Sequence, residues 1–248
     1  MFTARIAVSI VSHSHGDMVA DLVQQLLECS QVKQVLVTCN VPEVLILPID
    51  SRVQRIDNPQ PKGFGANHNA AFEHCQAPYF CVLNPDVRFD GNPFPALLNC
   101  LGGGVALCAP VVTNPAGLIE DSARQFPSFQ GLFSKLVGIS DGRYCYGRND
   151  PQLHPDWVAG MFMLFPAADY AALGGFDEKY FLYYEDVDLC VRLWRSGRKI
   201  VLCPQATVVH AAQRASHRNL RHLTWHLGSM MRYFIRHWGR LPAVGAQR

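Results

Sequence analysis

The chain has 248 residues, of which 49% are apolar and 17% are charged, and its formal net charge is +2. The length fits one large α/β domain or two small ones, and the apolar content excludes a disordered or fibrous protein. No apolar run reaches the length of a membrane-spanning helix, and the first run, Ile6 to Val11, is too short for a signal-peptide core. We therefore expect a cytoplasmic protein.

The charge is unevenly distributed along the chain. Residues 1–188 hold 11 Lys and Arg and all 20 acidic residues, whereas residues 189–248 hold the other 11 basic residues and no acid. The two parts therefore carry net charges of −9 and +11. A basic tail of this kind requires an anionic partner or an acidic surface on the protein itself.

The nine cysteines include no C-x-x-C pair, and most of them lie in apolar runs. Without a signal peptide, this pattern predicts reduced thiols rather than disulfides or a cysteine metal site. We expect most of these side chains to be buried, because cysteine packs as a small apolar residue.

Short apolar runs alternate with helical patterns in the first third of the chain. Four runs predict strands, at Arg5–Ser12, Val35–Val37, Val53–Ile56 and Tyr79–Leu83. Helices are predicted after Gly16, with Asp17 as the N-cap, and after Gly63. Strands that alternate with helices form a mostly parallel sheet with helices on both faces, and ligands bind beyond the carboxyl ends of its strands.

The later part of the chain begins with a weakly patterned segment. Residues 113–156 are rich in Gly, Pro, Asn and Asp, which predicts long loops. Beyond them we expect a strand, a short helix, a longer helix and two further strands, over 157–165, 166–173, 185–196, 199–203 and 206–209.

From Ser216 to Trp238, apolar residues recur at three- and four-residue steps among arginines, which predicts a basic amphipathic helix. Two interpretations of this helix remain open. Either Leu220, Leu227 and Phe234 pack on the domain while the arginines face solvent, or the helix attaches to an anionic membrane leaflet. Binding to nucleic acid is not expected, because no nucleic-acid module is visible and the rest of the chain is acidic.

Four polar segments follow predicted strands or open predicted helices. In Lys62–Asn69, glycines before a helix let backbone N–H groups approach an anion, although a structural helix entry fits equally well. Asp86 in Asn84-Pro85-Asp86 ends a hydrophobic strand, where a carboxylate can hold a divalent metal, but these residues by themselves favour an ordinary turn. His210, at the end of another strand, is a candidate ligand of the same metal.

The fourth segment opens a helix with three carboxylates in four residues, Glu185, Asp186 and Asp188. Acidic residues in a first helical turn complement the helix dipole, and an Asp188–Arg192 pair fits the same structural interpretation. The aromatic cluster just before them is not needed for that purpose. Carboxylates beside aromatic rings are typical of a partly desolvated general base.

In this order and spacing, the segments resemble glycosyltransferase family 2, which has the GT-A fold, and within it the bacterial rhamnosyltransferase-like branch. The motifs that carry the resemblance are Lys62-Gly63-Phe64 with Asn67 and Asn69, Asn84-Pro85-Asp86, Trp157 with Gly160, the stretch from Gly174 through Arg192, and His210. The resemblance implies one GT-A domain over residues 1–212, with a mostly parallel sheet flanked by helices. A basic helical tail would follow over residues 213–248.

The resemblance also implies roles for individual residues. Asp86 and His210 match ligands of Mg²⁺ or Mn²⁺ on the donor diphosphate, Asp186 matches the catalytic base, and Glu185 stands beside it. The positions that match the nucleotide site are Ser12, Cys39, Asn40, Asn58, Gly63, Asn67, Asn84 and Arg214. Cys39 stands where the family usually has an aspartate that faces the nucleotide base, and a thiol cannot accept the same charge-assisted hydrogen bond.

The function implied by the resemblance is inverting transfer of a sugar from a nucleoside-diphosphate sugar. The expected donor is dTDP-L-rhamnose, and the expected acceptor is a lipid-linked glycan in bacterial surface polysaccharide synthesis. The alternative is a non-catalytic sugar-nucleotide or glycan binding protein of the same fold, which Cys39 favours and Asp86, Asp186 and His210 oppose. A nucleotidyltransferase would need a basic, glycine-rich loop near the first strand, and this chain has none there.

Overall fold

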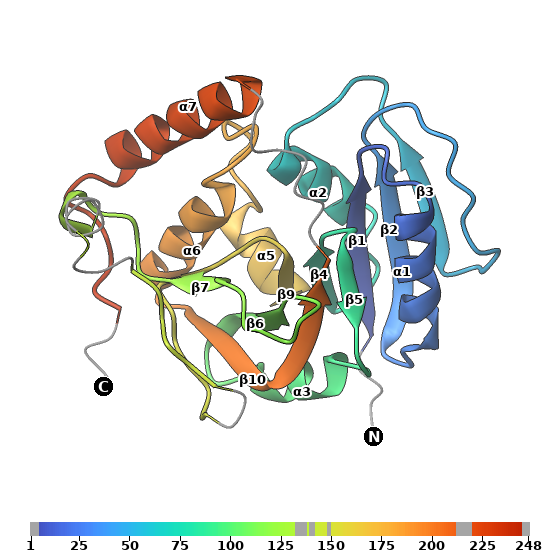
Figure 1. The fold of residues 1–248 in the computed structure, drawn as a ribbon, viewed down its shortest axis with the longest axis horizontal. Helices are drawn as coiled ribbons and strands as arrows, with labels where there is room; N and C mark the ends of the chain where they lie inside the picture. Colours follow the sequence, from blue (N-terminus) through green and yellow to red (C-terminus); the bar gives the residue numbers. More distant parts are fainter. Residues whose placement is uncertain (1–4, 132–137, 139–141, 148–149, 212–219, 245–248) are drawn as a thin grey trace.

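The computed structural model describes residues 5–131, 138, 142–147, 150–211 and 220–244, and shows a central sheet with helices on both faces (Figure 1). The strands of this sheet are β1 Ile6–Ser12, β2 Val32–Cys39, β3 Val53–Asp57, β4 Tyr79–Leu83, β5 Val87–Phe89, β6 Val105–Thr113, β9 Phe162–Pro166 and β10 Lys199–His210. They lie in the order β3-β2-β1-β4-β9-β6-β10-β5. A two-stranded sheet pairs β7, Ala123–Arg124, with β8, Trp157–Val158.

The predicted mixed architecture with a mostly parallel sheet is confirmed. Strands β3, β2, β1 and β4 run parallel to one another, and β6 runs parallel to β10. Strand β9 is antiparallel to β4 and β6, and β5 is antiparallel to β10. Because β1, β2 and β3 are parallel, Ser12, Cys39 and Asn58 lie together at the carboxyl ends of these strands, where a ligand site is expected.

Helices cover both faces of the sheet (Figure 1). The sheet therefore separates two hydrophobic clusters, one under each layer of helices. The helices are α1 Asp17–Glu28, α2 Phe64–Phe72, α3 Phe94–Cys100, α5 Ala167–Leu173, α6 Glu185–Arg195 and α7 Leu220–His237. Buried residues of α1 and α3 belong to one hydrophobic cluster, and those of α2, α5, α6 and α7 belong to the other. Strand β4 feeds both clusters, because its side chains alternate between the two faces.

Three local expectations need correction. Gly16, not Asp17, is the N-cap of α1, and its φ of 52° is a conformation that glycine adopts readily. The two strands expected near the end of the domain are one strand, β10, whose pairing with β6 shifts register between Cys203 and Thr207. The strand expected over 157–165 is two strands, β8 and β9, which belong to different sheets. Strands β5 and β6 and helix α3 were not predicted.

Most cysteines are buried, as predicted: Cys29, Cys39, Cys81, Cys100, Cys108, Cys190 and Cys203. No helix within the described part of the chain has the length and hydropathy needed to cross a membrane. The boundary expected at residue 212 lies in a segment outside the described residues and stays a prediction.

Helix α7 is joined to the domain through Asp188 of α6. This buried carboxylate accepts hydrogen bonds from His237 at 2.8 Å and from Arg192 at 2.7 Å, which confirms the expected Asp188–Arg192 pair. Tyr233 of α7 is also buried in the domain core. The interpretation in which the apolar residues of the tail pack on the domain is wrong in part, because Leu227 is exposed and Phe234 is only half-buried. The side chain of Leu220 lies outside the described residues.

Candidate active site

A hydrogen-bonded network of asparagines lies beyond the carboxyl ends of β1, β2 and β3. Asn40 Oδ1 accepts hydrogen bonds from the Asn58 amide at 2.9 Å and from the Lys62 backbone N–H at 2.8 Å. The Asn58 amide also donates to Asn67 Oδ1 at 2.6 Å. The Ser12 carbonyl accepts a hydrogen bond from the Asn40 N–H at 2.8 Å. The fold thus brings together predicted nucleotide-site residues from three neighbouring strands.

Asn67 and Gly63 fix the turn that enters α2. The buried Asn67 amide donates to the carbonyl oxygens of Lys62 at 3.1 Å and Gly63 at 2.9 Å, so Asn67 would act on a nucleotide by positioning this turn. A β-carbon at Gly63 would lie 2.6 Å from the Phe181 carbonyl oxygen, so this approach requires glycine. The Phe64 N–H donates to that same oxygen at 2.9 Å. The glycine loop is therefore held against the segment that precedes α6.

Asn69 connects α2 to the Gly174-Gly175-Phe176 motif. Its Oδ1 accepts hydrogen bonds from the Tyr170 hydroxyl at 2.7 Å and from the Phe176 N–H at 3.0 Å, and its amide donates to the Phe176 carbonyl at 2.9 Å. Gly175 has a φ of 64°, and a β-carbon there would collide with Asn69. Two motifs that are far apart in the sequence therefore form one packed unit beside the site.

Asp86 and His210 meet where β5 pairs with the end of β10. His210 Nε2 lies 3.1 Å from Asp86 Oδ2, and His210 Nδ1 lies 2.7 Å from Glu120 Oε2. Because both residues follow strands, Asp86 and His210 were expected to reach one metal ion. Glu120 was not predicted, since it lies in the segment expected to form long loops and has no motif around it. An acidic residue in that segment was the only available signal.

The two carboxylates of this cluster favour the protonated, cationic form of His210 between them. Burial opposes protonation of His210, but hydrogen bonds and attraction from Asp86 and Glu120 outweigh it and raise the imidazole pKa to about 9. Burial also acts to raise the pKa of Asp86, but the hydrogen bond and charge of His210 outweigh it and lower that pKa below its ordinary value. Asp86 is therefore held in its ionised form.

The same residues fit a divalent cation such as Mg²⁺ or Mn²⁺. Asp86 Oδ1 is buried and has no hydrogen-bond partner among the described residues, which leaves a carboxylate oxygen for a ligand. A carboxylate on Nδ1 of a histidine fixes the ring, as in many metal sites, and a divalent cation would displace the proton that His210 Nε2 shares with Asp86. Asp86 and His210 would be the direct ligands, and Glu120 would orient His210.

Asp186 lies in the first turn of α6, beside the backbone of Gly160. Its Oδ2 accepts the Gly160 N–H at 3.0 Å, and its Oδ1 accepts the Val187 N–H at 2.8 Å. Burial raises the pKa of Asp186, and these N–H groups oppose the shift without reversing it. A raised pKa gives the ionised carboxylate a greater affinity for a proton, which suits a general base.

Glu185 is more deeply buried than Asp186, and its Oε2 has no hydrogen-bond partner within the described part of the chain. Burial and the neighbouring charge of Asp186 raise the pKa of Glu185 well above its usual range. The residues just before it, Tyr183 and Tyr184, have φ values of 71° and 66°. Two consecutive tyrosines in the left-handed region store strain, which is common at functional sites.

One short backbone segment joins the two acidic centres. Gly160 donates to Asp186, while the carbonyl of the next residue, Met161, accepts the Asn84 N–H at 2.9 Å. A β-carbon at Gly160 would lie 3.2 Å from the Phe64 ring, so the glycine loop also packs here. The strand-end turn, the entry to α2 and Asp186 therefore surround the same two residues.

Cys39 is buried at the end of β2. Burial raises the pKa of its thiol to about 11, so the side chain stays neutral at physiological pH and does not replace a carboxylate. Arg214 lies outside the described residues, and its predicted contact with the donor stays a prediction.

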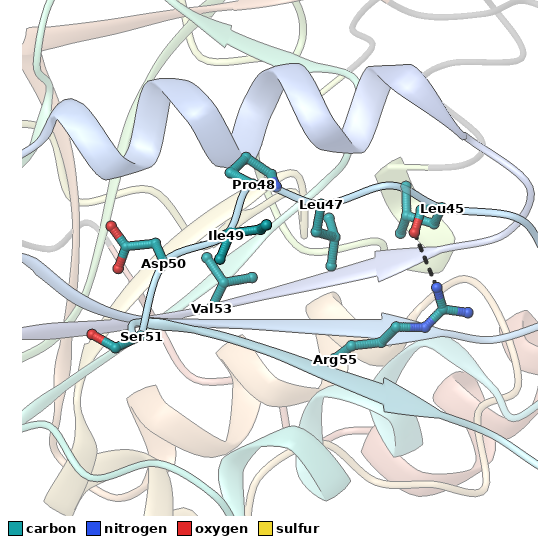
Figure 2. Close-up of a pocket in the computed structure, with 8 residues that line it drawn as sticks. All are labelled: Leu45, Leu47, Pro48, Ile49, Asp50, Ser51, Val53 and Arg55. Atoms are coloured by element: carbon teal, nitrogen blue, oxygen red, sulfur yellow. Dashed lines mark hydrogen bonds between the residues drawn. The ribbon is translucent and has the colours of Figure 1, made fainter.

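The molecule also has a hollow of about 440 Å³ away from these groups, between β3 and the connection from β2. Figure 2 shows Leu45, Leu47 and Ile49 along that connection and Arg55 on β3, with the Arg55 guanidinium donating to the Leu45 carbonyl at 3.1 Å. None of the predicted site residues lines this hollow, and its walls are mostly aliphatic. We therefore place the candidate active site at the strand ends instead.

Residues 4–225 match the family described as "Glycosyltransferase like family 2". The chain belongs to glycosyltransferase family 2. This glycosyltransferase is 28% identical over 250 residues to the rhamnosyltransferase WbbL of Escherichia coli K12, and the alignment covers 93% of each chain. It is 33% identical over 175 residues to the N-acetylglucosaminyl-diphospho-decaprenol L-rhamnosyltransferase of Mycobacterium tuberculosis, covering 65% of this chain and 57% of that relative.

Solved structures confirm that the glycosyltransferase has the GT-A fold. It resembles GalNAc-T7 with UDP, GalNAc and Mn²⁺, with a TM-score of 0.65 and 12% identity over 84% of this chain and 44% of that chain. It also resembles the mannosyltransferase PcManGT from Pyrobaculum calidifontis in complex with GDP-Man and Mn²⁺, with a TM-score of 0.59 and 13% identity over 92% of this chain and 64% of that chain.

Proposed function

We propose that this glycosyltransferase moves L-rhamnose from dTDP-L-rhamnose, with inversion, to a lipid-linked glycan during bacterial surface polysaccharide synthesis. Two relatives are named as rhamnosyltransferases, and the name of the mycobacterial one specifies N-acetylglucosaminyl-diphospho-decaprenol. These names support a rhamnosyl donor and an acceptor carried on a polyprenyl diphosphate. We further propose that the enzyme works in the cytoplasm, where a nucleotide sugar is available.

The observation that carries an enzymatic rather than a binding role is the arrangement around Gly160 and Met161. On one side, Asp186 has a raised pKa and a fixed carboxylate. On the other side, the turn that ends in Asp86 holds an ionised carboxylate against His210. Inverting transfer needs a base for the acceptor hydroxyl and a group that supports the leaving diphosphate, and the two centres match these needs.

In the proposed reaction, Asp186 accepts the proton of the acceptor hydroxyl while that oxygen attacks C1 of the donor sugar. The bond between C1 and the diphosphate oxygen breaks on the opposite face, so one displacement inverts the configuration at C1. The Gly160 N–H holds the Asp186 carboxylate in one orientation, which limits the entropy lost at the transition state.

Asp86 and His210 would hold Mg²⁺ or Mn²⁺ in this scheme. When bound, such a cation neutralises negative charge that develops on the leaving diphosphate. Glu120 keeps the His210 ring in place through Nδ1, and the carboxylate of Asp86 stays ionised beside it. The Mn²⁺ complexes of the two solved neighbours support this assignment.

A screen of purified protein against nucleotide sugars, with Mn²⁺ or Mg²⁺ present, tests the proposal. Thermal shift reports binding, and release of nucleoside diphosphate in the presence of a polyprenyl-diphosphate glycan reports transfer. We expect dTDP-L-rhamnose to give the largest thermal shift and to release dTDP only when acceptor is present. A larger response to another donor would contradict the rhamnosyl assignment.

Cys39 keeps one alternative open, a non-catalytic protein that binds a sugar nucleotide or glycan. Its buried neutral thiol removes a charge that the family uses toward the nucleotide base. The same screen separates the two functions. Donor binding without nucleotide release, across the donors and acceptors tested, would favour the binding protein.

A further inference from the structure

Helix α7 carries an apolar stripe on the side that faces away from the domain. Its members, spaced by three or four residues, are Leu223, Leu227, Met231, Ile235 and Trp238 just past the helix end, and each is between 48% and 74% exposed. The opposite side of the helix holds the buried residues Ser229, Tyr233 and His237. The helix therefore contacts the domain through one face and leaves its apolar stripe uncovered.

The outer stripe extends onto the neighbouring segment that holds Phe129, and it has a basic edge. Phe129 is exposed and packs its ring 4.8 Å from that of Trp238. A hollow of about 540 Å³ opens where the stripe meets the segment before α6, and it is lined by Met231, Ile235, Lys179, Arg232 and Arg236 along with Asp177 and Gly228. Aliphatic side chains thus lie directly beside three cationic ones.

We propose that the outer stripe of α7, defined as Leu223, Leu227, Met231, Ile235 and Trp238, lies in an anionic membrane leaflet. Helices with an apolar face and basic flanks bind at the boundary between lipid headgroups and acyl chains. Lys179 and Arg232 would face lipid phosphates at the edge of the stripe. Arg236 is already paired with Asp177 and Asp188, so it mainly holds the helix on the domain.

Charge decides between a leaflet and a second copy of the chain as the occupant. Helix α7 contains Arg221, Arg232 and Arg236 and no acidic residue. A symmetric dimer through the stripe would place two such basic edges together, whereas an anionic leaflet offers the opposite charge. No helix in the described residues can span a bilayer, so contact through one helix face is the mode that this surface supports.

The buried side of α7 packs on the segment that carries the proposed base. Trp225 stacks 4.7 Å from Phe181, and the Tyr183 hydroxyl lies 3.1 Å from His222 Nδ1. That segment leads directly into Glu185 and Asp186. A helix about 10 Å across would thus separate the leaflet from the start of α6, which would place the base near a membrane-bound acceptor. This role rests on the proposed lipid-linked acceptor, whereas membrane binding itself does not.

Vesicle flotation of the full chain, without donor or acceptor, tests the proposal. One set of vesicles contains phosphatidylcholine alone, and the other contains about one third phosphatidylglycerol. We expect binding to the anionic vesicles that weakens as salt rises, because lipid charge is screened. Failure of this binding would leave the nucleotide-sugar screen unaffected, so the two proposals can fail separately.

Three variants separate the contributions. A triple variant, Leu227→Gln, Met231→Gln and Ile235→Gln, should bind at least tenfold more weakly at all salt concentrations. A double variant, Lys179→Gln and Arg232→Gln, should lose roughly 25-fold at low salt and much less at high salt. The matched control is Val44→Gln, Ile46→Gln and Ile49→Gln, which removes three even more exposed apolar residues from the connection between β2 and β3 and should bind as the parent does.

Thermal melting and nucleotide-sugar binding of each variant show that the fold and donor site are intact. Equal binding of the parent to neutral and anionic vesicles would overturn the electrostatic part of the proposal. Unchanged binding of the stripe variant would overturn the assignment of this face. A dimer in sedimentation that the stripe variant abolishes, with no vesicle binding by the parent, would identify a second copy as the occupant and overturn the leaflet.

Discussion

Asp86 and Asp186 are both carboxylates at the ends of regular elements, yet their surroundings act on them in opposite directions. Asp86 lies 3.1 Å from His210, whose charge lowers the Asp86 pKa. Asp186 receives only backbone N–H groups, and burial raises its pKa. The difference teaches that the neighbours of a carboxylate decide whether it suits a cation or a proton.

The largest effect is expected from removing the proposed proton acceptor, Asp186. Asp186→Asn should keep the Gly160 hydrogen bond and donor binding, because an amide oxygen still accepts, but it should lower kcat by at least ~10². Steady-state turnover and calorimetric donor binding check both expectations. Turnover close to that of the parent would remove Asp186 from the mechanism.

The next effect concerns the cation side. Asp86→Ala should abolish metal-dependent donor binding, and His210→Ala should weaken it, since both would hold the cation that meets the diphosphate. Donor titrations with and without Mn²⁺ measure this, and Asp90→Ala, an exposed acid nearby, is the control. If EDTA leaves donor binding and turnover of the parent untouched, the metal assignment is wrong.

A smaller effect is expected from the carboxylate that supports His210. Glu120→Gln should lower the affinity for Mn²⁺ by about 10- to 100-fold, the usual range for a residue that orients a metal-binding histidine. Glu73→Gln removes an exposed carboxylate and should leave the affinity unchanged. The same affinity in Glu120→Gln and Glu73→Gln would show that Glu120 is a bystander.

The smallest effect is expected at Glu185, the buried carboxylate beside Asp186. The raised pKa of Glu185 means that the folded state holds its proton more tightly than the unfolded state. Its contribution to stability is therefore present at and below its ordinary value of 4.5 and is lost as pH rises through the folded-state value. Glu185→Gln removes this loss, so its melting temperature relative to the parent should rise from about pH 5 to about pH 8, by about 2–4 °C for each kcal/mol of the loss. A difference that stays flat with pH would contradict the raised pKa of Glu185.

Much of the fold could be predicted from local signals. The apolar runs over Ile6–Ser12 and Tyr79–Leu83 predicted two central strands, and the acid-rich start at Glu185 predicted α6. Strands β5 and β6 and helix α3 were not predicted because they are short or entirely buried. A buried run shows no alternation of apolar and polar residues. β10 was predicted as two strands because Pro204 and Gln205 interrupt the apolar pattern, although the strand only shifts register there.

The candidate site was predictable where its residues follow strands or open helices. Asp86 and His210 end strands, and the chain order of the motifs resembled one family, so both could be named before their contact was known. Glu120 could not be named, because its partner is 90 residues away and no periodic pattern surrounds it. The positioning role of Asn67 could not be predicted either, since only the folded structure shows that its amide donates to the Lys62 and Gly63 carbonyls.

Three properties could be predicted from the sequence without the fold: the alternation of strands and helices, the resemblance to glycosyltransferase family 2 and the amphipathic character of the tail. These are properties of neighbouring residues, whose spacing can be read along the chain. The tertiary structure alone decided the opposite pKa shifts of Asp86 and Asp186, the place of Glu120 and which face of α7 the domain covers. Each depends on groups that are distant in sequence, because burial and electrostatic interaction arise from proximity in space.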